Sequence, residues 1–209
     1  MSVPLRQVDA VSRPDHYYLE DSDSVFYLRE YTSRRGWSHG ETNQLICNLK
    51  KPMGRVGLPD WVYKSRAITQ CARELRAAVQ ADATWVPVPP SKAKSDSLYD
   101  DRLCQILRKA FPQGDIRELV TQPVSTAASH TTGQSKPLPS QLAANYTIDA
   151  SLGQPKSAVI VFDDILTTGS HFKAMQLKLA QTFPRAEIYG LVIARRVLGC
   201  QADWCNFTR

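Results

Sequence analysis

An apolar run that ends in two aspartates and a hydroxyl-rich turn constrains this fold most: residues 157–171 read SAVIVFDDILTTGSH. Residues 158–162 are apolar without alternation and rich in β-branched side chains, which is typical of a strand covered on both faces. Phe172, Met175 and Leu179 then recur at helical spacing before Pro184. The pattern predicts a central parallel strand, a turn over residues 167–170 and a helix.

The polar residues behind this strand predict a ligand site. Ligands of open α/β sheets bind at the carboxyl ends of the strands, where Asp163 and Asp164 fall. A glycine turn that opens a helix offers free N–H groups to an anion, and Thr167, Thr168 and Ser170 add hydroxyls. A ligand with hydroxyls or a metal at one end and a phosphate at the other, such as ribose 5-phosphate, suits both halves. The alternative is a capped turn with a solvated acidic pair.

The order hydrophobic strand, Asp-Asp, two aliphatic residues, Thr-Thr-Gly resembles the phosphoribosyl pyrophosphate (PRPP) motif of type I phosphoribosyltransferases. The resemblance implies that Asp163 and Asp164 hold the 2- and 3-hydroxyls of ribose. It also implies that five consecutive residues wrap the 5-phosphate: Thr167, Thr168, Gly169, Ser170 and His171.

Two positions depart from the motif. His171 stands where the family usually has a small residue, and its ring faces either the phosphate or water. Thr167 stands where the 6-oxopurine enzymes carry an aspartate that acts as general base, so hypoxanthine–guanine chemistry is disfavoured.

A second candidate loop follows the segment ATWVPVPPSK. Prolines end the predicted strand at residues 86–88, and backbone N–H groups that turn inward at a strand end can meet an anion. In the resemblance this is the pyrophosphate loop, formed by Pro90, Ser91 and Lys92, where the family often has a cis peptide bond. Lys92 is the candidate ligand of pyrophosphate.

The polar segment after this loop resembles the mobile lid that closes over the reacting centre in the family. Lys94, Tyr99 and Arg102 are available to it, although Lys94 is equally compatible with a solvated surface. Asp100 and Asp101 precede an amphipathic helix that contains Leu103, Ile106, Leu107 and Phe111, and we expect both aspartates to cap it.

Strand and helix alternate from residue 60 onward, which indicates an α/β fold with a parallel sheet. The expected fold class is a type I phosphoribosyltransferase-like parallel sheet flanked by helices, with a small N-terminal hood lobe. We assign residues 1–55 to the N-terminal segment and hood lobe, and residues 56–209 to the core. Residues 121–155, rich in Ser, Thr, Pro, Gln and Gly, are expected to form a long loop of little regular structure that contributes to the hood.

Within the hood lobe, residues 17–19 and 25–31 predict a short strand pair. Ser38 and Glu41 form a capping box before a helix that contains Leu45, Ile46 and Leu49. Asp60 is expected to cap a long helix whose apolar face includes Ile68, Cys71 and Leu75. A last buried strand is predicted over residues 186–194.

Further positions resemble the ComF-type branch of the superfamily, over most of residues 25–195. They are VPVPPSK, an LKK turn, and the spaced Thr131, Gln134, Leu138 and Asn145. The chain lacks the four-cysteine zinc finger common in that branch, and Leu142 replaces an arginine.

The net charge of +6 fits either a nucleic-acid surface or a basic pocket for phosphates, and we favour the pocket because the basic clusters are small. No apolar run reaches the ~20 residues that span a bilayer, and the start lacks a signal-peptide core, so we expect a cytoplasmic protein without membrane contact. Five cysteines without a C-x-x-C pair suggest reduced thiols, and Cys200 and Cys205 alone make no zinc site.

Two functions of different class remain. The first is a Mg²⁺-dependent phosphoribosyltransferase in which Asp163, Asp164 and Lys92 are the catalytic residues and both aspartates orient the metal indirectly. Its ligands would be PRPP, ribose 5-phosphate or nucleoside 5-monophosphates. The second is a non-catalytic PRPP- or nucleotide-binding regulatory module of ComF type, and a homodimer is open in either case.

The acceptor base is not identified by any residue. The hood, built from residues 17–50 and 125–146, contains aromatic residues that either stack on a ring or fill the core of the lobe: Tyr27, Tyr31, Trp37 and Tyr146.

Overall fold

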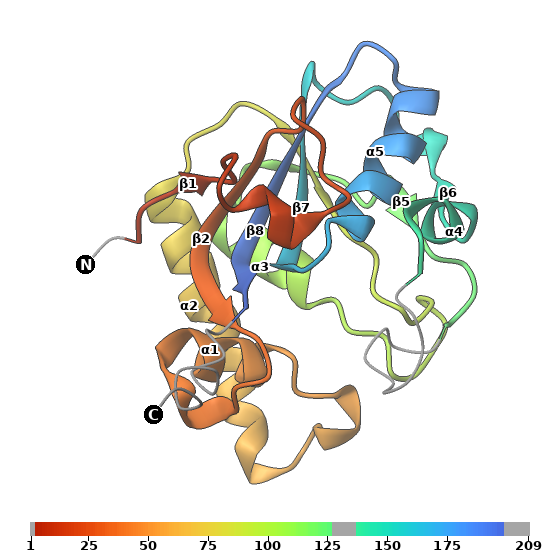
Figure 1. Cartoon of the computed structure of the whole chain (residues 1–209). Coiled ribbons are helices and arrows are strands. Elements are labelled where there is room, and N and C mark those ends of the chain that lie inside the picture. The colour runs from red at the N-terminus through yellow and green to blue at the C-terminus, as the bar shows by residue number, and fades with distance from the viewer. Residues whose placement is uncertain (1–2, 127–136, 199–209) are drawn as a thin grey trace, which may run out of the picture.

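A six-stranded sheet flanked by helices forms the centre of the molecule (Figure 1). The computed structural model describes residues 3–126 and 137–198. The strands lie in the order β1-β2-β8-β7-β3-β4, and every neighbouring pair is parallel apart from β1 and β2. Their bounds are β1 Arg6–Gln7, β2 Val25–Thr32, β3 Thr84–Pro87, β4 Asp115–Ile116, β7 Ala158–Leu166 and β8 Glu187–Val197. The sheet is therefore mixed but mostly parallel.

The predicted central strand is confirmed as β7, and it continues to Leu166. Its residues 159–162 are buried, as a strand covered on both faces should be. On one side β7 pairs with β8 as far as Leu166, but on the other its pairing with β3 ends at Phe162. Asp163 and Asp164 thus follow the last β3 contact, where one edge of β7 is open to other groups.

Helices cover both faces of the sheet (Figure 1). Helices α2 (Val62–Ala78) and α3 (Arg102–Ala110) pack together behind it, and α5 (Ser170–Thr182) lies in front, next to the short α4 (Pro139–Ala144). Helix α1 (Glu41–Leu49) packs on α2. The described part of the chain also contains short 3-10 turns: Arg13–His16, Trp37–His39, Met53–Arg55, Pro59–Trp61 and Ala150–Leu152.

The predicted strand pair in the hood lobe is wrong. Residues 17–19 form no strand, and β2 pairs antiparallel with β1 and parallel with β8. Val25 and Leu28 are fully buried there, which explains why β2 belongs to the main sheet. Of the segment assigned to the hood, α1 and the residues after it project beyond the carboxyl ends of β2 and β8 (Figure 1).

Two predicted caps are also wrong. Gly40 is the N-cap of α1 without a side-chain cap, because Ser38 lies in a separate 3-10 turn. Trp61 is the N-cap of α2, and Asp60 instead accepts hydrogen bonds from Lys51 and Arg55. The carboxylate of Asp60 is thus engaged by tertiary contacts and not by the first turn of α2.

Residues 121–155 contain more regular structure than predicted. Strands β5 (Val120–Thr121) and β6 (Thr147–Ile148) pair antiparallel, and α4 lies between them. These elements are too short to give a periodic signal, and Tyr146, only 2% exposed, fixes them to the core. Within residues 3–126 and 137–198, no helix has the length and apolar character needed to cross a membrane.

Candidate functional site

A cavity of about 500 Å³ opens at the carboxyl ends of β3 and β7. It brings together most of the residues that the sequence singled out: Pro90, Ser91, Lys92, Lys94, Tyr99, Arg102, Asp163, Asp164, Thr167, Ser170 and His171. Thr168 is not in its wall, and Gly169 lines a smaller recess that shares Asp163, Thr167 and His171 with it. The two motifs predicted from separate parts of the chain therefore face one space.

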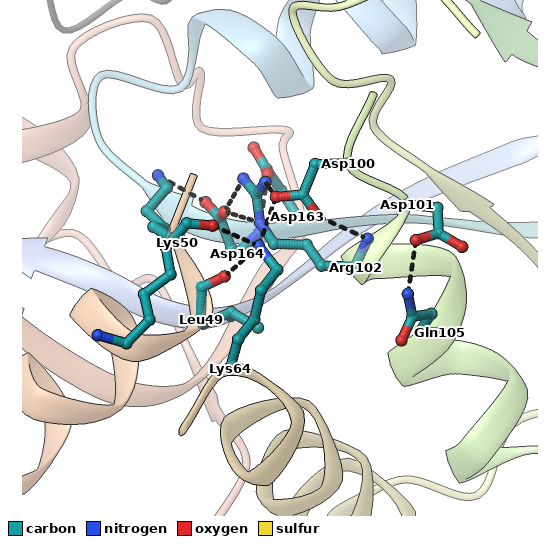
Figure 2. Close-up of polar contacts among 10 residues, drawn as sticks. Leu49, Lys50, Lys64, Asp100, Asp101, Arg102, Gln105, Asp163 and Asp164 are labelled. Carbon is teal, nitrogen blue, oxygen red and sulfur yellow. Dashed lines mark hydrogen bonds and ion pairs between the residues drawn. The ribbon is translucent and has the colours of Figure 1, made fainter. Parts of the chain in front are cut away.

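Asp164 lies at the centre of a network of buried charges (Figure 2). Its Oδ1 is 3.0 Å from Nζ of Lys50, and its Oδ2 accepts hydrogen bonds from Nε (3.0 Å) and Nη2 (2.5 Å) of Arg102. Burial alone would raise the pKa of Asp164, but Lys50 and Arg102 outweigh it and lower that pKa. Asp164 is thus a buried anion that two cations neutralise.

The network continues to α2 through Asp100. Oδ2 of Asp100 accepts hydrogen bonds from Arg102 (2.7 Å) and from Lys64 (2.6 Å), as Figure 2 shows. Nζ of Lys64 also donates to the carbonyl oxygens of Leu49 (3.0 Å) and Lys51 (2.8 Å). Lys64 therefore fixes the turn that carries Lys50 into the cavity.

Sequence reasoning missed the roles of Lys50 and Lys64. Lys64 carried a usable signal, since it precedes Ile68 by four residues and Cys71 by seven and so lies on the apolar face of α2. A lysine on such a face needs buried partners. Lys50 carried no comparable signal, because its contact with Asp164 depends on the packing of α1.

Unlike its neighbour, Asp163 forms no ion pair with any of the residues that the structure describes. Its Oδ1 accepts a hydrogen bond from the backbone N–H of Asp164 (2.7 Å). Burial and the charge of Asp164 raise the pKa of Asp163. Both aspartates line the cavity, but Lys50 and Arg102 already occupy the oxygens of Asp164, so Asp163 is the carboxylate that a ligand can reach.

The predicted turn between strand and helix is confirmed. Gly169 has a φ of 87° and is the N-cap of α5, which begins at Ser170. The backbone conformation requires glycine here, and a Cβ on Gly169 would in addition lie 2.9 Å from Cδ2 of Leu19, which would have to shift. Thr168 and Ser170 are buried, and the hydroxyl of Thr168 lies 3.2 Å from that of Ser170.

The predicted lid residues are held by polar contacts. Nζ of Lys94 and the hydroxyl of Tyr99 donate to Glu118, at 2.7 and 3.0 Å. Arg102 begins α3 with its guanidinium on Asp164 and Asp100, and these carboxylates raise its pKa against the effect of burial. Glu118 was missed, because its partners lie far away in sequence.

Pro90, Ser91 and Lys92 form the cavity wall next to β3. The carbonyl oxygen of Ser91 accepts hydrogen bonds from the N–H of Thr126 and from Nε2 of Gln122, both at 2.8 Å. Nζ of Lys92 is 3.9 Å from Asp96. The cis peptide expected here is not found, since the bonds between Pro90 and Lys92 are trans.

Of the two aspartates expected to cap α3, only Asp100 bonds a helix N–H, and it does so from the position before the N-cap. Oδ1 of Asp100 accepts from the N–H of Arg102 at 3.2 Å. Asp101 occupies the N-cap position of α3 without a side-chain cap, because its carboxylate accepts from Gln105 (Figure 2).

The hood aromatics divide into two kinds. Tyr27 and Tyr146 are buried in the core, whereas Trp37 is 54% exposed and Tyr31 packs against the core edge. Thr131, Gln134, Cys200 and Cys205 lie outside the described residues.

No group of three or more His, Cys, Asp and Glu side chains that could hold a metal occurs among the residues described here. A metal at this site would need ligands from water or from a bound molecule in addition to Asp163. Comparisons with known protein-family models and with curated proteins find no match to this chain.

Proposed function

We propose that the protein binds PRPP and transfers its 5-phosphoribosyl group to a base or base-like acceptor, with release of pyrophosphate. The observation that carries this proposal is the single cavity at the ends of β3 and β7. An open carboxylate, a hydroxyl–glycine turn and a lysine-bearing loop all line that cavity or its recess. In this proposal the chain is a type I phosphoribosyltransferase of the ComF-like branch.

Each group of residues that lines the cavity or the recess suits one part of PRPP. Asp163 accepts hydrogen bonds from the ribose hydroxyls, and the turn around Gly169 binds the 5-phosphate at the N-terminus of α5. Lys92 and the loop from Pro90 bind pyrophosphate. Lys50 and Arg102 line the same cavity and add positive potential where the charge of the leaving pyrophosphate develops.

The donor set fits Mg²⁺, the expected cofactor. Magnesium is usually bound by one or two carboxylates together with substrate phosphates and waters, and Asp163 supplies one such carboxylate. When bound, Mg²⁺ would neutralise charge on the departing pyrophosphate. Asp163 orients the ribose and its associated cation, while Asp164 acts through Lys50 and Arg102.

The chemical step replaces one bond at C1 of ribose by another. The bond to the pyrophosphate oxygen breaks, an acceptor nitrogen forms the new bond, and its proton leaves with water or base. Lys94 and Tyr99, which both contact Glu118, form the wall that would exclude water from the oxocarbenium-like centre.

A non-catalytic PRPP- or nucleotide-binding module is the second candidate. The observation in its favour is that Lys50 and Arg102 already occupy both oxygens of Asp164. Only one carboxylate of the pair is then open to ribose, and a site with one carboxylate can bind the ligand without advancing the reaction.

Calorimetry with PRPP, with and without Mg²⁺, followed by mass spectrometry of products from a mixed nucleobase pool, tests the proposal. Magnesium-dependent binding with a nucleoside 5-monophosphate product supports the enzyme. Binding without product supports the module, and no binding of PRPP or ribose 5-phosphate contradicts both.

A further inference from the structure

The N-terminal segment packs against the turn that follows β7. We call residues 12–23 the N-terminal clasp. In Figure 1 this red segment lies in front of the sheet, beside the blue loop that enters α5. Nδ1 of His16 lies 2.5 Å from the carbonyl oxygen of Thr167, and the N–H of Tyr18 donates to the carbonyl oxygen of Thr168 at 3.0 Å. The clasp therefore holds two successive carbonyl groups of the turn.

These contacts determine where the neighbouring N–H groups point. In a trans peptide the C=O and N–H bonds point in opposite directions. Because the clasp holds the carbonyls of Thr167 and Thr168, the N–H groups of Thr168 and Gly169 point away from it. No clasp residue lines the cavity or the recess, whereas Thr167 and Gly169 line the recess. In the part of the chain that the structure describes, neither N–H has a hydrogen-bond partner.

His16 is built into the fold as a hydrogen-bond donor. It is fully buried, and its partner, a carbonyl oxygen, can only accept, so Nδ1 carries the proton. Burial lowers the pKa of His16, and Arg195 and Arg196 lower it further, against the opposing effects of Thr167 and Asp15. The neutral ring with the proton on Nδ1 is therefore the form that holds Thr167.

The clasp is anchored independently of the turn. Asp23 lies 3.0 Å from Nζ of Lys173 on α5 and accepts a hydrogen bond from Gln176 at 3.0 Å. Nη2 of Arg196 on β8 donates to the carbonyl oxygen of Asp15 at 2.8 Å. With both ends fixed to core elements, the clasp can impose an orientation on the turn between them.

We propose that His16 is a positioning residue, which holds the turn so that the N–H groups of Thr168 and Gly169 face a bound phosphate. The proposal rests on the proposed function only in taking the ligand to carry a 5-phosphate. It predicts that the clasp governs the phosphate-dependent part of binding, while Asp163 governs the ribose-dependent part.

The test compares two substitutions of His16. In His16→Asn the amide N–H can occupy the place of Nδ1–H, whereas His16→Leu keeps an apolar volume and removes the donor. We expect His16→Leu to weaken ribose 5-phosphate binding about tenfold, the value of one lost oriented hydrogen bond, and His16→Asn to restore most of it. Arg13→Ala is the matched control, because Arg13 lies in the same segment and its side chain pairs with the exposed Asp21 and not with the turn. Equal affinities for all four proteins would overturn the proposal.

A measurement on the unaltered protein covers the case in which His16→Leu does not fold. In a titration with inorganic phosphate, the amide NMR signals of Thr168 and Gly169 should shift most. Shifts confined to other amides would show that these N–H groups do not face the anion and would overturn the inference.

The two proposals fail separately. If phosphate shifts these amides and binding depends on His16, but PRPP is not consumed, the positioning role stands and the enzymatic one fails. If His16→Leu consumes PRPP with unchanged KM and kcat, the positioning role fails and the enzyme stands.

Discussion

Nζ of Lys50, just after α1, lies 3.0 Å from Oδ1 of Asp164 on the central strand. This ion pair joins the segment outside the sheet to the site, and Arg102 completes the neutralisation of Asp164 from α3. The two adjacent aspartates therefore differ: Lys50 and Arg102 neutralise Asp164, whereas Asp163 is the carboxylate to which we assign the proposed ligand.

Substituting Asp164 should cost stability. Asp164→Asn leaves Lys50 and Arg102 next to a neutral amide in a buried site, and we expect the free energy of unfolding to fall by about 3 kcal/mol or more. Urea denaturation measures it. Asp101→Asn is the control, since among the described residues the Asp101 side chain hydrogen-bonds only to Gln105, and the substitution should change stability by less than about 0.5 kcal/mol. Equal effects of both substitutions would contradict the network.

Substituting Asp163 should have the opposite effect. Its pKa is raised in the folded protein, so between the unfolded pKa of about 3.9 and the raised value the folded state binds more protons, and stability falls as pH rises. Asp163→Asn removes the unfavourable buried charge of the ionised carboxylate. It should therefore increase the free energy of unfolding at pH 7.5 by at least about 1 kcal/mol. The gain should shrink toward pH 4. A destabilised variant at pH 7.5 would contradict the assignment.

For His16 we expect the opposite dependence of stability on pH. Its pKa is lowered in the folded protein, so stability is fully present above the unfolded pKa of about 6.5 and is lost as pH falls below it. Asp15, Arg195 and Arg196 are the charged groups that act on the ring. The difference in Tm between pH 7.5 and 5.5 should be smaller in His16→Asn than in the unaltered protein. His39→Asn, at an exposed position, should not change it.

The contact between Gly169 and Leu19 can be tested by a double-mutant cycle. Gly169→Ala should destabilise by about 1–3 kcal/mol, because alanine is strained at a φ of 87° and its Cβ would meet Leu19 at 2.9 Å. Leu19→Ala removes the clash but not the strain, so the two substitutions together should cost at least about 0.5 kcal/mol less than the sum of the separate costs. Thermal denaturation of the four proteins checks this, and simple additivity would contradict the packing.

Much of the sheet was predictable, because β3, β7 and β8 are apolar runs and α2, α3 and α5 are periodic. The partner of β2 was not, since parallel pairing with β8 joins residues far apart in sequence and leaves no local signal. A predicted helix cap was wrong where the side chain had a tertiary partner instead, as for Asp60 with Lys51.

In the candidate site, too, some residues were predictable from the sequence and others were not. Asp163 and the turn at Gly169 were predictable because they lie within one strand–turn–helix unit. Lys50, Glu118 and His16 were not identified, because each reaches the site through the packing of a different element. Sequence patterns describe such elements one at a time, whereas the charge network depends on how they meet.

The central claim is that Asp163 binds the ribose of a 5-phosphoribosyl ligand. The most direct measurement is a calorimetric titration of the unaltered protein and of Asp163→Asn with PRPP and Mg²⁺ at pH 7.5. Because the variant should fold at least as stably as the unaltered protein, lost affinity can be attributed to the site. We predict that PRPP binds the unaltered protein and that Asp163→Asn weakens it at least ~tenfold. Equal affinity, or no binding by either protein, would contradict the claim.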